Sequence, residues 1–290
     1  MKSTIQVSKL SNRKKKGVNW IALFPLLIFS IGFQVIPIIS LISSSFSTKQ
    51  GISLENYQHA FTPHIMEAFQ NSIQLSLVTA VLGVSLGFIV GYAIISTDNK
   101  LVKDALIALA DVTTNFGGAP LAFAFIVTLG STGVITLVLK SIGVFLYPNF
   151  RIYSISGLAI AYLYFQIPLM IMLILPALQG LKKEWWEAAI NMGANSQQFW
   201  MRIGIPILGP SLMSSFFILF ANSFGAYATA WTLTGPDVNI ITVQIASLIR
   251  GEVQLEIGLA DALAVVSLFI ILFCVGGYLF LSSKAKRFRA

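Results

Sequence analysis

The sequence predicts an all-α membrane protein with six transmembrane helices, and three observations support this prediction. Of the 290 residues, 56% are hydrophobic and only 10% are charged, and the mean hydropathy is +0.81. Soluble domains average about 25% charged residues. Long apolar runs recur along the chain, and the lysines and arginines gather at its ends and in alternate loops. The net charge of +8 therefore fits a membrane protein, and nucleic acid is not an expected partner.

Six apolar runs reach the length of about 20 residues that a transmembrane helix needs. We expect them at residues 18–46, 68–96, 104–139, 152–178, 206–233 and 257–281. The third should begin irregularly, because Gly-Gly-Ala-Pro at 117–120 interrupts a mixed stretch. The second contains Gly83, Gly87 and Gly91 at helical spacing, which predicts a face that packs closely against another helix.

The distribution of basic residues predicts the orientation. If the N-terminus is cytoplasmic, the inside segments hold fifteen of the 19 lysines and arginines, so both termini are expected in the cytoplasm. The chain then divides into a basic N-terminal segment at 1–17, a transmembrane domain at 18–283 and a basic tail at 284–290. The first apolar run is too long for a signal peptide and is expected to remain as a helix.

Residues that carry catalytic chemistry are scarce. Cys274 is the one cysteine of the sequence, and it lies in an apolar run, so neither a disulfide nor a cysteine metal site is expected. His59 and His64 could hold a metal, but a solvated loop explains them as well. The sequence contains no G-x-x-x-x-G-K-[ST] motif and no nucleophile beside a base, which predicts a protein that is not an enzyme and binds no nucleotide or metal cofactor itself.

The loop at 182–206 differs from the other loops. Its first half contains good helix formers and ends at Gly193, and a second short helix can begin near Asn195 and run to Pro206. Tryptophan, phenylalanine and isoleucine side chains give this pair of helices apolar faces. Such a pair could lie on the membrane surface or dock into a groove of a partner, and composition alone leaves both alternatives open.

This loop resembles the EAA loop of the permeases of binding-protein-dependent ABC importers of type I. The matching positions are Glu187-Ala188-Ala189, Gly193, Ala194, Phe199, Ile203 and Ile205-Pro206. Ile205 stands where the family usually has leucine, a minor departure. More weakly, 53–57 resembles the family's L-x-N-Y stretch, and Thr114-Asn115 resembles the spermidine/putrescine and ferric iron branch.

The resemblance implies a multi-pass permease subunit of the bacterial cytoplasmic membrane, with a coupling helix between spans four and five. The coupling residues carried over are Glu187, Ala188, Ala189, Gly193 and Ala194. The implied partners are ATPase subunits that bind ATP and magnesium, a second and related permease, and an external solute-binding protein. The implied solute is a small polar molecule such as a polyamine.

Polar residues inside spans are costly and point to a solute pathway. Candidates are Asp111, Thr114, Asn115, Asn222, Tyr227 and Trp231, with Thr113 and Ser223 beside them and Asp261 near the outer end of span six. Each of these side chains could instead bond to a neighbouring helix or lie near the membrane interface.

Two rival functions need no ATPase partner. A secondary transporter would require internal repeats and a coupling-ion site, and a channel would require a selectivity-filter signature. Neither pattern is evident in the sequence.

Overall fold

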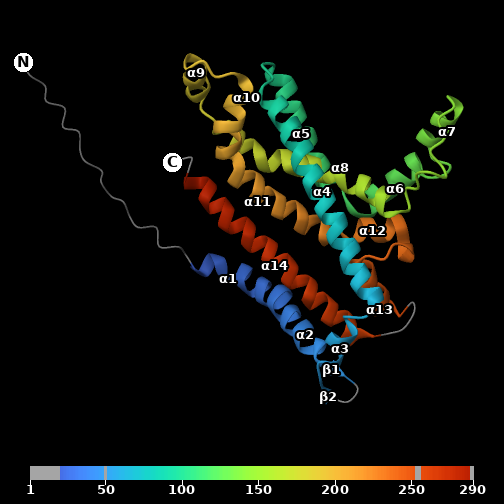
Figure 1. Cartoon of the computed structure of the whole chain (residues 1–290). Coiled ribbons are helices and arrows are strands. Elements are labelled where there is room, and N and C mark those ends of the chain that lie inside the picture. The colour runs from blue at the N-terminus through green and yellow to red at the C-terminus, as the bar shows by residue number, and fades with distance from the viewer. Residues whose placement is uncertain (1–19, 49–50, 252–255, 288–290) are drawn as a thin grey trace, which may run out of the picture.

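The computed structural model describes residues 20–48, 51–251 and 256–287, and these form a bundle of helices (Figure 1). The predicted basic segment at 1–17 and the last three residues of the predicted tail lie outside the described residues. Six helices are long and apolar enough to cross a membrane, which confirms the predicted number of spans. They are Leu23–Ser45, Pro63–Ile95, Gly118–Ser141, Ile155–Gln179, Ser196–Phe224 and Ile257–Ser283.

The first span contains a π-helical turn next to a proline. It consists of α1 (Trp20–Ser30), the π-helix η1 (Ile31–Val35) and α2 (Ile36–Ser45). Pro37 has no N–H to donate, and a proline in a helix commonly coincides with such an irregular turn. A short hairpin follows, made by β1 (Ser47–Thr48) and β2 (Gly51–Ile52), and then α3 (Glu55–His59).

The second span, α4 (Pro63–Ile95), packs against the fourth, α8 (Ile155–Gln179). The glycines predicted to form a packing face are buried there. A Cβ added to Gly87 would lie 2.5 Å from Met170 Cβ and 2.9 Å from the carbonyl oxygen of Ile167. Only glycine allows the two backbones to come this close, so the predicted packing face is confirmed.

The segment predicted as one third span is three helices: α5 (Lys100–Asn115), α6 (Gly118–Leu129) and α7 (Val134–Ser141). The break before α6 agrees with the prediction. A second break at residues 130–133 was not predicted. Gly133 makes this turn possible, because a Cβ there would lie 2.5 Å from the carbonyl oxygen of Thr128. In Figure 1, α7 extends away from the other helices.

The C-terminal half departs from the predicted boundaries at three points. The fifth span begins at Ser196, ten residues before the predicted start at 206, and ends at Phe224 instead of 233. The last part of the predicted fifth span forms a separate helix, α12 (Tyr227–Thr234). The sixth helix, α14, runs to Arg287, so the predicted boundary of the tail at 284 falls inside a helix.

The other elements of this half are short. They are α9 (Lys183–Asn191), α10 (Ser196–Phe199), the π-helix η2 (Trp200–Gly204), α11 (Ile205–Phe224), the 3-10 turn η3 (Gly235–Asp237), α13 (Ile241–Arg250) and α14 (Ile257–Arg287).

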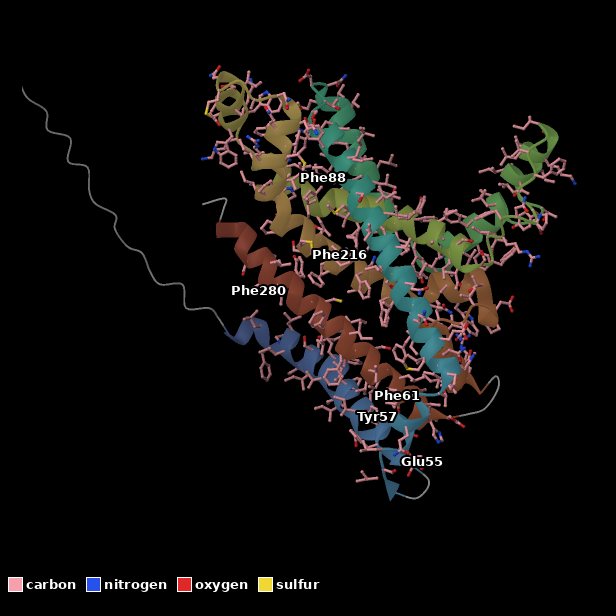
Figure 2. The ribbon with its side chains drawn as sticks, in the orientation of Figure 1. Glu55, Tyr57, Phe61, Phe88, Phe216 and Phe280 are labelled. Carbon is pink, nitrogen blue, oxygen red and sulfur yellow. The ribbon has the colours of Figure 1, made fainter. Side chains whose placement is uncertain are left out.

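The core of the molecule lies where α4, α8, α11 and α14 meet. Large apolar side chains also cover the outside of the spans: Phe33 is 71% exposed and Phe273 is 75% exposed, as expected for surfaces that contact lipid. Figure 1 shows α1, α9 and the end of α14 toward one end of the bundle, and α3 and α13 toward the other. Figure 2 places Phe88 in the half that holds α9, and Tyr57 and Phe61 in the opposite half.

Candidate functional site

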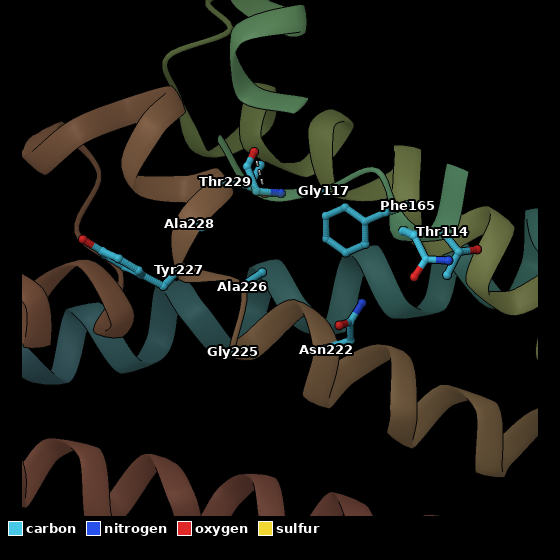
Figure 3. A pocket seen from close by; sticks show the side chains of 11 residues that line it. Thr114, Gly117, Phe165, Asn222, Gly225, Ala226, Tyr227, Ala228 and Thr229 are labelled. Carbon is cyan, nitrogen blue, oxygen red and sulfur yellow. Dashed lines mark hydrogen bonds between the residues drawn. The ribbon is translucent and has the colours of Figure 1, made fainter. Parts of the chain in front are cut away.

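Two interrupted helices meet inside the molecule. The chain breaks between α5 and α6 at 116–117, and between α11 and α12 at 225–226. The Gly118 N–H donates a 2.9 Å hydrogen bond to Thr229 Oγ1 and so ties the two breaks together (Figure 3). Gly118 has a φ of +69°, a conformation that glycine adopts without strain.

Buried polar side chains of neighbouring spans hold the α11–α12 region in place. The Tyr162 hydroxyl of α8 donates to the carbonyl oxygen of Ala226 at 2.6 Å. About one helical turn further along α8, Gln166 Nε2 donates to the carbonyl oxygen of Leu219 at 2.8 Å. The Thr79 and Ser223 hydroxyls lie 2.8 Å apart. The first two of these bonds reach backbone carbonyl oxygens of the α11–α12 region, and the third joins side chains of α4 and α11.

The two breaks border a cavity of about 600 Å³ (Figure 3). Its lining contains hydroxyl, amide and aromatic groups but no carboxylate, lysine or arginine. The lining residues are Thr114, Asn115, Gly117, Gly118, Phe165, Asn222, Gly225, Ala226, Tyr227, Ala228 and Thr229. A neutral surface with hydrogen-bonding groups suits a small polar solute.

The structure brings together four of the predicted pathway residues, because Thr114, Asn115, Asn222 and Tyr227 all line this cavity. Asp111 does not line it. This residue is exposed one helical turn before Asn115, whose amide donates to the Asp111 carbonyl oxygen at 2.9 Å.

Three further predicted positions lie outside the cavity lining. Thr113 bonds to its own helix through Leu109 O at 2.7 Å, and Ser223 is buried against Thr79. Asp261 accepts a short hydrogen bond from the Ser44 hydroxyl and so joins the sixth span to the first. Ser223 and Asp261 therefore match the alternative in which polar groups bond to neighbouring helices.

Trp231 lies next to the cavity rather than in its lining, and it contacts a residue that sequence reasoning missed. Its ring centroid is 5.9 Å from that of Tyr227. The Arg250 guanidinium lies 4.5 Å from the Trp231 centroid and 5.9 Å from the Tyr227 centroid, within the range of cation–π attraction. Nothing in the local sequence around Arg250 indicates this contact, because α13 brings the residue there through the fold.

Other residues missed by sequence reasoning are Gly118, Phe165 and Thr229. The one sequence signal for the cavity is the glycine pair at 117–118, which interrupts the predicted third span. Phe165 and Thr229 carry no such signal, since an aromatic ring or a threonine in an apolar helix is ordinary.

The predicted coupling loop is a compact turn between α9 and α10. Helix α9 ends in a Schellman motif: the Ala194 N–H donates to Ala189 O at 3.0 Å, and the Gly193 N–H donates to Ile190 O at 2.8 Å. Gly193 has a φ of +83°, as this motif requires. The predicted helix stop at Gly193 is therefore confirmed.

A capping box begins the second half of the loop. The Asn195 side chain accepts from the Gln198 N–H at 2.8 Å, and the Gln198 side chain accepts from the Asn195 N–H at 2.9 Å. The helix then continues through η2 into α11 without stopping at Pro206, because the π-helical turn directly before this proline accommodates its missing N–H.

The two faces of α9 differ in character. Ala189 is 1% exposed and lies against the body of the protein. Ala188 and Glu187 are exposed, and Glu187 pairs with Lys183 at 3.6 Å. On the inner side, a cluster of rings links the loop to α4, with centroid distances of 4.7 Å between Trp186 and Phe199 and 4.9 Å between Trp200 and Tyr92.

No family model matches the chain, but its sequence is similar to those of known transport permeases. The chain is 23% identical over 240 residues to the spermidine/putrescine transport system permease protein PotB of Haemophilus influenzae, covering 80% of this chain and 82% of that protein. It is 24% identical over 211 residues to a probable sulfate transport system permease protein, cysT, of Helicosporidium sp., covering 71% of this chain and 73% of that protein.

Solved structures share the fold. A bacterial ABC transporter involved in the import of alginate matches with a TM-score of 0.72 at 18% identity, covering 92% of this chain and 94% of that chain. The methionine ABC transporter MetNI matches with a TM-score of 0.52 at 13% identity, covering 77% of this chain and 99% of that chain. The chain is thus an all-α, multi-pass protein of the bacterial inner membrane that resembles, in sequence and in fold, the permease subunits of binding-protein-dependent ABC importers.

Proposed function

We propose that this chain is the permease subunit of an ABC importer and forms one half of its solute pathway. The observation that carries the proposal is the open, polar cavity at the two helix breaks. Irregular backbone within a membrane is stable only where protein buries it or where it lines a water-filled cavity. The hydroxyl group of Thr114 and the amide groups of Asn115 and Asn222 border this cavity, which suits a path for a polar solute.

The open side of the cavity requires a second chain. A polar wall facing lipid would leave its hydrogen-bonding groups unpaired at high cost. A second permease of the same fold would close the path from the other side. We propose a different but related chain as that partner, giving a heterodimer.

The loop at 182–206 is the proposed contact with the ATPase subunits, which would bind ATP and magnesium. Helix α9 presents Glu187 and Ala188 to the outside, and small residues permit close docking. The rings of Trp186, Phe199 and Trp200 connect α9 and η2 to α4. A displacement of the loop by the ATPase would therefore move the spans as rigid bodies and expose the cavity alternately to each side.

We propose a polyamine as the solute, delivered by an external solute-binding protein. The relatives named for spermidine and putrescine support a polyamine, and the relative named for sulfate supports a rival anion.

Uptake into proteoliposomes tests this function. The complex of this chain, its permease partner and the ATPase should accumulate labelled spermidine only with ATP and the loaded binding protein. Labelled sulfate serves as the competing solute. Uptake of either solute by the permease chains without ATP would establish a secondary transporter or a channel instead. Accumulation of sulfate but not spermidine would overturn the polyamine assignment and leave the importer assignment intact.

A further inference from the structure

A second cavity, of about 500 Å³, lies under the loop and apart from the solute path. It is bordered by the last turn of α4, the last turn of α8, and the residues of α9, α10 and η2 that face them. None of its lining residues borders the cavity at the helix breaks. The solute pathway therefore does not explain it.

The walls of this second cavity are apolar and its exposed edge is basic. Leu178 and Phe199 are 3% and 5% exposed and form part of its floor. Lys182 and Lys183 also line it and are exposed, as is Asp98. The two ammonium groups outnumber the carboxylate, which favours a ligand with a negative charge.

Both lysines remain available to such a ligand. The contact of Lys183 with Glu187 spans 3.6 Å, with the two side chains 85% and 58% exposed, so solvent screens this ion pair and it contributes little. The Lys182 ammonium lies 5.9 Å from the Trp185 ring centroid, at the outer limit of cation–π attraction. Neither contact would prevent a phosphate oxygen from binding.

The level of the cavity indicates where its ligand comes from. The apolar runs of α4 and α8 end at Ile95 and Leu178, and both residues line the cavity. The cavity therefore lies where the hydrocarbon core gives way to lipid headgroups, among the rings of Tyr92, Trp186 and Trp200 that are typical of this interface. An acyl chain fits the apolar floor, and a phosphate fits the lysines.

We propose that this cavity binds an anionic phospholipid of the leaflet that faces the ATPase, with its phosphate on Lys182 and Lys183 and part of an acyl chain against Leu178 and Phe199. The assignment to the cytoplasmic leaflet rests on the proposed function, whereas the binding of the lipid does not. Because Trp186 belongs to α9, a bound lipid would support the loop from the membrane side.

Lipid retention tests the proposal on the full-length chain. The chain is purified from nanodiscs containing equal amounts of phosphatidylglycerol and phosphatidylcholine, and the retained lipids are identified by native mass spectrometry. The double substitution Lys182→Gln/Lys183→Gln should lower the retention of phosphatidylglycerol at least about tenfold, given the attraction of each lysine to an anionic surface. The matched control, Lys100→Gln/Lys103→Gln, removes the same charge from α5 and should leave retention unchanged.

A second variant separates the acyl chain from the phosphate. Ser96 lines the cavity, and Ser96→Trp should fill it and expel the lipid while keeping both lysines. Inorganic phosphate should not displace the lipid, because a free anion makes no use of the apolar floor. Equal losses in the two lysine pairs, full retention by Ser96→Trp, or displacement by inorganic phosphate would each overturn the proposal. No step uses ATP or solute, so a failed uptake experiment leaves this result unaffected.

Discussion

Gly193 has a left-handed backbone conformation, and the space around it is open. Its φ of +83° lies in the left-handed region, yet a Cβ added there would meet no atom within 4 Å. The requirement is therefore one of backbone conformation and not of space. Left-handed backbone costs most residues roughly 1–2 kcal/mol, while asparagine adopts it more readily.

The first prediction uses this difference. Gly193→Ala should loosen the turn between α9 and α10 and lower both co-purification of the ATPase and uptake per ATP hydrolysed. Gly193→Asn should retain more of each, although its side chain is larger. Gly209→Ala is the control, because Gly209 also has open space around it but lies within α11. If alanine and asparagine behaved alike at 193, the left-handed turn would not be what the loop needs.

Other residues show the limit of reading sites from sequence. Thr114, Asn115 and Asn222 could be named as pathway candidates because polar side chains are rare inside spans. The contact of Arg250 with Trp231 could not be predicted, since it joins two helices through the fold. Ser223 looks like the candidates in sequence but turns toward Thr79, and only the structure distinguishes it.

At the scale of elements, the α4–α8 contact depends on the glycines of α4. Gly87→Ala places a methyl group 2.5 Å from Met170 Cβ, and we expect the two helices to move apart. Overpacking of this kind lowers the free energy of unfolding by roughly 1–3 kcal/mol. Thermal unfolding in detergent should show a lower Tm than for the unmodified chain.

Gly276→Ala is the matched control for this second prediction. Gly276 also lies in a span, but a Cβ there meets no atom within 4 Å. Its Tm should be unchanged or slightly raised, because alanine favours helix more than glycine does. Equal Tm values for the two variants would contradict a close approach of α4 and α8.

Elements formed by local signals were predictable, and those formed by distant contacts were not. The glycine ladder, the stop at Gly193 and the start near Asn195 are encoded by neighbouring residues. The break at 225–226 has one glycine in an apolar run, and the Tyr162 hydroxyl that bonds to the Ala226 carbonyl oxygen lies 64 residues away in the chain. A continuous fifth span to 233 was therefore the natural expectation, and it was wrong.

At the scale of the whole molecule, the six spans and the basic residues predict one orientation. Fifteen of the 19 lysines and arginines belong to the segments expected inside. The structure adds that α9 and the end of α14 lie toward the same end of the bundle, while α13 lies toward the other (Figure 1). The loop and the C-terminus should thus share one compartment, and the positive-inside rule predicts that this compartment is the cytoplasm.

Cysteine labelling tests this third prediction. The one native cysteine, Cys274, is removed as Cys274→Ser, and single cysteines are introduced as Asp237→Cys in η3 and Asn191→Cys at the end of α9, both at exposed positions. A membrane-impermeant maleimide should label position 237 in intact cells and position 191 only after lysis in denaturant, which also removes any bound partner. Labelling of position 191 in intact cells would place α9 outside, where no ATP-hydrolysing subunit could reach it, and the proposed coupling of this chain to an ATPase would be untenable.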